Sequence, residues 1–364
     1  MSSERTIARL WRNAVAAERD TPAYLEQRGE EWVPISWEEA ARRVDDYANG
    51  LLALGVRKGD AFALIGRTRV EWALFDFALG LVGAIGAPIY ANSSPKDTGY
   101  ILGHSESVGV LVEDEEQRAK VEEVRAELPL LQHVLSFDDL DDLAARGRAY
   151  AQEQPEALRE AAEAIREDDL FTYIYTSGTT GPPKGCMISH RNYYAMVAVV
   201  DHLERFTTVG DVMLLYLPLA HNFGRLMHLS GPYVGYTVAF LPDPLQAAAA
   251  LPAVKPTVFP SVPRVYEKVH TAVVSKFDEE TGVKRKLIDW ALRVGREVSR
   301  RKRAGEPVPR GLALQYGLAD KLVYSKVKKR LGGLQRVGQE CDRVAHVRAR
   351  EVHQAPEVVR ERQV

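Results

Sequence analysis

The sequence predicts an α/β protein with layered, largely parallel sheets and helices on both faces. Short apolar runs rich in β-branched residues alternate with helix-like segments along the N-terminal half of the chain, and this alternation is typical of parallel strands joined by crossover helices. The 364 residues are 46% hydrophobic and 27% charged, which is ordinary for a globular protein. A glycine-rich run at residues 176–185 follows one predicted strand, where open α/β sheets bind their ligands.

The first strand–helix–strand unit contains the most apolar stretch of the chain, residues 72–89. Its length suggests a membrane span, but Asp76 and several glycines interrupt it and Pro88 stands near its end. These residues favour a buried helix that turns into a strand. The predicted order is a strand at 61–65, a helix from Trp72, a strand at 87–90, a helix at 98–104 and a strand at 108–112.

Residues 138–168 are rich in Ala, Glu, Asp and Arg, and Tyr150 is their only aromatic residue. This composition predicts an exposed helix and connector that lead into the next strand.

Residues 281–303 predict a basic amphipathic helix. Apolar or small residues recur at helical spacing, and Lys and Arg occupy most other positions. Such a helix suggests contact with a membrane surface or an acidic partner. The solvated face of an ordinary surface helix is the alternative, and it is the commoner role of a basic run. The apolar or small positions are Leu287, Ile288, Ala291, Leu292, Gly295 and Val298.

The run at 175–185 (YTSGTTGPPKG) has the composition of a phosphate-binding loop. An apolar strand at 169–175 precedes it, and a helix-like segment at 193–203 follows. Glycines let the backbone approach an anion, hydroxyls add directional donors, and a lysine adds positive charge. The candidate ligands of a polyphosphate are Thr176, Ser177, Gly178, Thr179, Thr180, Gly181 and Lys184.

Two other interpretations of this run are weaker. A surface turn has a similar composition, but it does not require so many phosphate-binding groups together. The nucleotide P-loop needs four residues between its glycines and a Gly-Lys-Ser or Gly-Lys-Thr sequence that opens a helix. In this chain Gly178 and Gly181 are only three positions apart, and Cys186 follows Gly185.

Residues 176–185 resemble the phosphate-binding signature of the adenylate-forming enzymes, which include acyl-CoA synthetases, luciferases and nonribosomal peptide adenylation domains. Residues 217–225 (LPLAHNFGR) resemble the family's second core motif in its fatty-acyl form. Residues 260–268 and 320–327 are similar to segments of long-chain acyl-CoA synthetases. The resemblance extends from Trp37 to Gly333 and implies the N-terminal domain of the adenylate-forming fold.

This resemblance implies a two-step activation of a long-chain fatty acid. ATP first converts the carboxylate to an acyl-adenylate and releases pyrophosphate, and coenzyme A then displaces AMP. The loop would hold the β- and γ-phosphates, with Mg²⁺ as the metal. His221 stands where the family places a residue near the carboxylate and α-phosphate, although on spacing alone it is an ordinary core histidine. Phe223 and Met227 would line an acyl tunnel, and core packing explains both equally well.

Several family features are missing from the sequence. We find neither the Tyr-Gly-x-Thr-Glu motif, whose glutamate binds Mg²⁺, nor the later Thr-Gly-Asp motif, whose aspartate holds the ribose. We therefore expect a partial AMP-binding domain at 1–333, an atypical disordered tail at 334–364, and no C-terminal lid domain. On this expectation the chain is truncated and weakly active or inactive. The alternatives are a catalytically dead binding protein with the same fold and an adenylating enzyme for another carboxylic acid.

Composition gives little sign of other partners. The formal net charge of −2 shows no nucleic-acid footprint. Two cysteines, Cys186 and Cys341, cannot build a disulfide framework, and the N-terminus has no signal-peptide pattern. We expect a cytoplasmic protein, with peripheral membrane contact through 281–303 as an open possibility.

Overall fold

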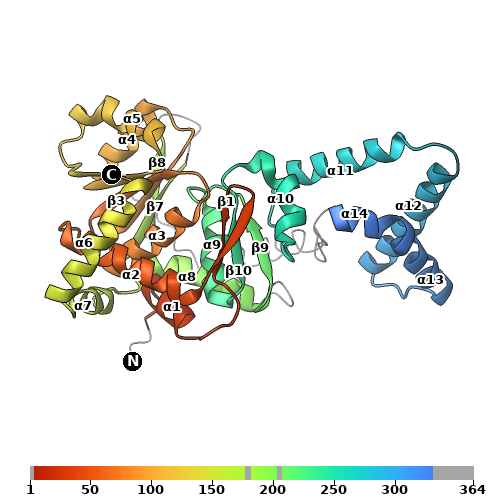
Figure 1. The fold of residues 1–364 in the computed structure, drawn as a ribbon, viewed down its shortest axis with the longest axis horizontal. Helices are drawn as coiled ribbons and strands as arrows, with labels where there is room; N and C mark the ends of the chain where they lie inside the picture. The colour runs from red at the N-terminus through yellow and green to blue at the C-terminus, as the bar shows by residue number, and fades with distance from the viewer. Residues whose placement is uncertain (1–3, 177–181, 203–206, 331–364) are drawn as a thin grey trace.

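A computed structural model describes residues 4–176, 182–202 and 207–330 (Figure 1). The larger of its two sheets has six strands, and all neighbours are parallel except the last two. Across the sheet the strands are β6 (His133–Ser136), β5 (Gly109–Val112), β3 (Ala61–Gly66), β4 (Ile85–Tyr90), β7 (Leu170–Thr176) and β8 (Lys184–Ser189).

The second sheet joins distant parts of the chain. Its third strand pairs in parallel with both of its neighbours, and the N-terminal hairpin forms one side. Its order is β2 (Glu31–Ile35), β1 (Tyr24–Arg28), β10 (Thr237–Phe240) and β9 (Val212–Leu215). The predicted α/β class with largely parallel sheets is therefore confirmed.

Helices cover both faces of the six-stranded sheet because side chains alternate along each strand. In β3, Ala63 and Ile65 belong to one buried cluster, whereas Phe62 and Leu64 belong to another. The first cluster includes residues of α4 (Pro95–His104) and α5 (Glu115–Val124). The second includes residues of α1 (Ile7–Val15), α2 (Trp37–Ala53), α3 (Val70–Val82), α6 (Leu140–Glu153) and α7 (Ala157–Glu163).

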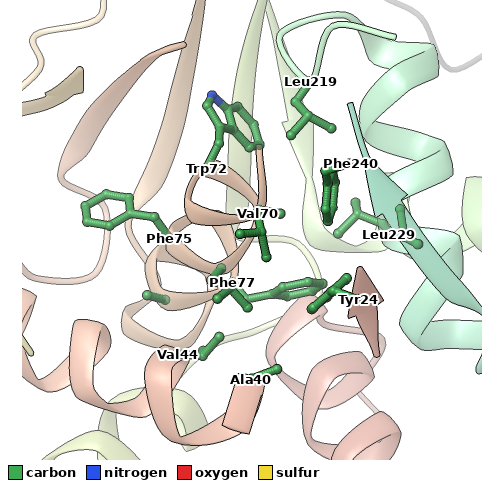
Figure 2. Close-up of a cluster of buried hydrophobic side chains, with 14 of the residues drawn as sticks. Tyr24, Ala40, Val44, Val70, Trp72, Phe75, Phe77, Leu219, Leu229 and Phe240 are labelled. Atoms are coloured by element: carbon green, nitrogen blue, oxygen red, sulfur yellow. The ribbon is translucent and has the colours of Figure 1, made fainter. Parts of the chain in front are cut away.

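Helix α3 lies in the core that the two sheets share. Every residue of α3 except Glu71 is buried. In Figure 2, Phe77 lies beside Tyr24, and Phe240 of the second sheet packs in the same cluster. The helix ends at Gly83, whose φ of 81° suits a residue without a side chain, and β4 begins at Ile85. The predicted buried helix followed by a strand is confirmed. In the part of the chain that the structure describes, no helix is both long and apolar enough to cross a membrane.

The predicted helix and connector at 138–168 are present as α6, α7 and the turn before β7, but α6 is exposed on one face only. Leu143 and Ala144 are buried in the main core, and α6 packs closely on α2. A Cβ added at Gly147 would lie 1.9 Å from the carbonyl oxygen of Asp46, so this crossing requires a glycine. The few apolar residues of the segment fall on one helical face, and the charged composition masks that face.

The remaining helices follow the glycine-rich run. Helix α8 begins at His190 with Ser189 as its N-cap, three residues earlier than the sequence predicts, and it ends at Ala198. The basic helix predicted at 281–303 is confirmed as α12 (Gly282–Arg303). The others are α9 (Asn222–Val234), α10 (Ala247–Val254), α11 (Pro263–Asp278), α13 (Arg310–Ala319) and α14 (Ser325–Arg330), with a π turn at Asp320–Tyr324 and 3₁₀ turns at Arg125–Glu127, Phe137–Asp139, Val199–His202 and Pro244–Gln246.

Candidate functional site

The candidate phosphate loop connects β7 and β8 at the carboxyl end of the parallel strands. Thr176 is the last residue of β7, Lys184 is the first residue of β8, and the two are partners in the antiparallel pair. Ligands of open α/β sheets bind at this edge. The predicted flanking strands are therefore confirmed. Five loop residues that the sequence singles out lie outside the described residues: Ser177, Gly178, Thr179, Thr180 and Gly181.

Both candidate phosphate ligands that the structure describes face solvent. Thr176 and Lys184 are exposed. Within the described part of the chain, no acidic side chain forms an ion pair with Lys184. Its ammonium group is therefore available to an anion that enters the loop.

The base of the hairpin is fixed by Tyr175. Its hydroxyl oxygen lies 3.0 Å from Nδ1 of His104, and the two rings meet edge to face. Burial raises the pKa of Tyr175 to about 12, so the phenol stays protonated and can donate to that nitrogen. A Cβ at Gly185 would lie 3.2 Å from Tyr175 Cζ. Gly185 thus leaves room for the Tyr175 ring, a packing reason that the loop motif does not reveal.

His221 caps the N-terminus of α9. Its Nδ1 accepts a hydrogen bond from the backbone N–H of Phe223 at 3.1 Å. Neutral imidazole carries one proton, so this contact places the proton on Nε2. The His221 side chain is exposed, and its Nε2–H can donate to a carboxylate or phosphate oxygen.

The turn before α9 depends on a close backbone approach. A Cβ at Gly224 would lie 2.2 Å from the carbonyl oxygen of Pro218, against backbone that cannot move aside easily. His221 N–H donates to that same Pro218 oxygen at 3.0 Å. The 217–225 motif therefore encodes a tight turn that presents His221.

Arg225 connects α9 to α3 and β7. Its guanidinium donates to both carboxylate oxygens of Asp76, with Nε 3.0 Å from Oδ2, and also to the hydroxyl of Thr172. Arg225 and Asp76 have no exposed side-chain surface. Cζ of Arg225 lies 4.5 Å from the ring centroid of Phe171. This buried group ties α9, which His221 caps, to β7, the strand that leads to the candidate phosphate loop.

The buried group of Arg225, Asp76 and Thr172 lies a short distance along the chain from both candidate site residues, Thr176 and His221. Four residues of strand, about 13 Å, separate Thr172 from Thr176. One turn of helix, about 6 Å, separates Arg225 from His221. Sequence reasoning noticed Asp76 as a charge in an apolar helix but gave Arg225 no role. An acid inside such a helix signals a buried partner, although spacing does not identify which one.

The two candidate tunnel residues lie on the same helix. Phe223 is half-buried at the edge of the main core, and Met227 is buried within it. Packing accounts for the position of each side chain. Their contact with an acyl chain stays a prediction.

The described residues do not build a metal site by themselves. Within them, no three or more His, Cys, Asp or Glu side chains are grouped so that they could hold a metal ion.

Comparison with known proteins places this geometry in a family. The model of the AMP-binding enzyme family matches residues 11–351. This stretch is longer than residues 37–333, over which the sequence motifs alone resemble the family. A long-chain-fatty-acid–CoA ligase, FadD15 of Mycobacterium bovis, is 34% identical over 327 residues, which are 87% of this chain and 53% of that protein. The human long-chain-fatty-acid–CoA ligase ACSBG2 is 29% identical over 342 residues, covering 90% of this chain and 50% of the relative. The chain thus spans about half the length of these curated relatives.

Solved structures show the same fold. The inhibitor-bound N-terminal domain of FACL13 from Mycobacterium tuberculosis superposes with a TM-score of 0.62 at 23% identity, over 72% of this chain and 64% of that one. The anthranilate CoA ligase AuaEII in complex with anthranoyl-AMP gives a TM-score of 0.63 at 20% identity, over 74% and 51% of the two chains. At such identities the likeness shows the fold alone. Together with the family match across residues 11–351, these observations establish that the chain belongs to the AMP-binding, adenylate-forming enzyme family.

Proposed function

We propose that this chain carries the ATP-binding part of a ligase that activates a long-chain fatty acid. The β7–β8 hairpin is the observation that carries the proposal. It presents Thr176 and Lys184 at the carboxyl edge of the sheet, on either side of a loop with a phosphate-binding composition. Lys184 forms no ion pair with any described residue. A polyphosphate suits this arrangement because its negative charge would meet the lysine ammonium group and the donors of the loop.

In the first step a carboxylate oxygen attacks the α-phosphorus of ATP. The bond from that phosphorus to the β-phosphate bridging oxygen breaks, and pyrophosphate leaves. Residues 176–184 would hold the β- and γ-phosphates and stabilise the charge that grows on the leaving group. Nε2–H of His221 would donate to the reacting oxygens. In the second step the coenzyme A thiol attacks the acyl carbon, and AMP leaves.

The proposed co-substrates are ATP and coenzyme A. Mg²⁺ commonly enters such sites with the phosphates of the nucleotide and needs only one or two protein carboxylates, which the described residues do not group together. The sequence also lacks recognisable motifs for the Mg²⁺-binding glutamate and the ribose-binding aspartate. We therefore expect weak turnover from this chain.

A fatty acid is favoured over other carboxylic acids. The relatives that match most of the chain are named long-chain-fatty-acid–CoA ligases, and residues 217–225 have the fatty-acyl form of their motif. We place the protein in the cytoplasm. A peripheral membrane contact through residues 281–303 extends this proposal.

Pyrophosphate release by the 364-residue chain tests the proposal against both alternatives. The assay supplies ATP with palmitate, benzoate or an amino acid, and hydroxylamine traps any acyl-adenylate as a hydroxamate. We expect slow release that depends on palmitate. Release with benzoate or an amino acid alone would identify an enzyme for another acid, and ATP binding without any release would identify a catalytically dead binding protein.

A further inference from the structure

The last three helices form a strongly basic part of the molecule. Residues 282–330, called the basic projection below, contain 15 Lys and Arg and four Asp and Glu, a formal net charge of +11, whereas the whole chain carries −2. Figure 1 shows α11 leading away from the two sheets, with α12 and α13 beyond its end. Positive charge is therefore concentrated in one protruding region.

A small core of its own holds the projection together. Ile288 and Ala291 of α12 pack against Ala319 and Val323. The hydroxyl of Tyr324 donates to the carbonyl oxygen of Ala291. Helices α12 and α13 thus bury their facing sides against each other, which leaves their other sides outward.

The outward side of α13 carries a leucine stripe. Leu314 and Leu318 of α13 lie one helical turn apart, on one side of the helix, and Leu322 follows four residues later in the π turn at Asp320–Tyr324. Their exposed fractions are 77%, 52% and 39%. Lys321 of the same π turn and Lys329 of α14 are also exposed. Contiguous exposed apolar residues bordered by charge mark an interaction surface.

Many cations of the projection have no acidic partner among the residues that the structure describes. On α12, Lys284, Arg285, Arg300 and Arg301 form ion pairs with nearby acids. The other five cations of α12 form no ion pair with any described residue: Lys286, Arg293, Arg296, Lys302 and Arg303. Arg296 and Arg303 also line a groove of about 440 Å³ between α12 and the helical segments that follow it, from Tyr316 to Lys328. The positive charge is therefore available to an external anion.

We propose that the basic projection binds the surface of an anionic lipid bilayer, with the leucine stripe in the interface and the unpaired cations at the phosphate level. Lipid head groups attract clustered Lys and Arg, while the apolar side of an amphipathic helix enters the boundary with the acyl chains. This proposal requires no ligase activity, and its test measures none.

Other occupants fit the surface less well. A second copy of the chain would bring two surfaces of +11 together, and like charges repel. A nucleic acid would use the cations but gives three leucines nothing apolar to enter. An anionic bilayer satisfies both the charge and the leucine stripe.

Vesicle co-sedimentation of the full 364-residue chain tests the proposal. Vesicles of phosphatidylcholine with about 30% phosphatidylserine should bind the protein at low salt, and pure phosphatidylcholine should bind it at least tenfold more weakly. Because one cation near an anionic surface contributes about a fivefold affinity, Lys321→Gln combined with Lys329→Gln should lower the affinity about 25-fold. Leu314→Ser with Leu318→Ser should lower it at least tenfold, since two apolar side chains leave the interface.

Two control variants carry matched substitutions outside the basic projection. Leu245→Ser removes a leucine that is 88% exposed, and Lys96→Gln removes an exposed cation of α4. Both should bind vesicles like the unmodified chain. All six substituted side chains are exposed, so a far-ultraviolet circular dichroism spectrum should confirm that each of the four variants is folded.

Four results would overturn the proposal. One is equal binding to anionic and neutral vesicles, or to neither. Another is unchanged vesicle binding in both projection variants. The third is a leucine variant that changes the mass of the protein in solution, which would assign the stripe to contact between copies. Binding of duplex RNA that needs the lysines but not the leucines, without vesicle binding, would assign the surface to nucleic acid.

Discussion

Arg225→Met should lower the free energy of unfolding by about 3–5 kcal/mol, the usual cost of removing one partner of a buried ion pair. The loss arises because the carboxyl group of Asp76, with no exposed side-chain surface, stays buried without the donors to both of its oxygens. Methionine fills much of the arginine volume, so an empty cavity contributes little. Urea unfolding followed by circular dichroism measures the change.

Two further variants separate charge from shape at this position. Arg225→Lys keeps a cation but cannot reproduce the planar fork that reaches Asp76 and Thr172, so it should lose an intermediate amount. Arg225→Met combined with Asp76→Asn removes both charges and should recover much of the stability. A loss below about 1 kcal/mol for Arg225→Met alone would contradict the anchoring role of the pair.

Acid should destabilise the protein through His228, and His228→Leu should remove that effect. Burial lowers the pKa of His228 to about 3, below the ordinary value of about 6.5 in an unfolded chain. The unfolded chain therefore takes up a proton first as the pH falls. The contribution to stability is fully present above about pH 6.5 and is lost progressively below it.

The size of the stability loss follows from the difference between the folded and unfolded pKa values of His228. Between pH 7 and pH 5, His228 alone should cost about 2 kcal/mol. Burial also lowers the pKa of His190 to about 4, so it adds a similar loss, and His228→Leu should remove about half of the total. Neither ring nitrogen of His228 has a hydrogen-bond partner among the described residues, and its ring packs against Phe77. An apolar side chain therefore suits the position.

Leu229→Ala is the matched control for this experiment. Leu229 is buried next to His228 on α9, and its truncation should cost about 2–5 kcal/mol. That loss should be the same at pH 7 and pH 5, because no titrating group is removed. A pH dependence that is identical in the unmodified chain and His228→Leu would show that this histidine is protonated in the folded protein.

Local signals predicted the elements around the phosphate loop well. The apolar run ending at Thr176 is β7, and the helical spacing of 281–303 is α12. Hydrophobic period and glycine placement encode such features within a dozen residues. The sequence also proposed a catalytic role for His221, which stays a prediction, and the structure adds that its Nδ1 caps α9.

Long-range pairing could not be predicted in this way. Asp76 and Arg225 are 149 positions apart, and nothing in either local pattern names the other residue. The burial of α6 was missed for a related reason. Its few apolar residues lie within a charged stretch, and only the close approach at Gly147 shows that α2 covers them. Contacts between distant segments depend on how the layers assemble, which periodicity does not specify.

Equilibrium titration of nucleotides into the chain and its Lys184→Ala variant tests the central claim most directly, namely that the β7–β8 loop holds the β- and γ-phosphates of ATP. Loss of one charge-assisted contact should weaken ATP and pyrophosphate binding by about 10–100-fold. AMP lacks both phosphates, so its affinity should stay within about twofold of the unmodified chain. Lys276→Ala, which removes an exposed cation of α11, should change none of the three affinities. Equal ATP affinity with and without Lys184, or an equal loss for AMP and ATP, would contradict the assignment of this loop to the β- and γ-phosphates.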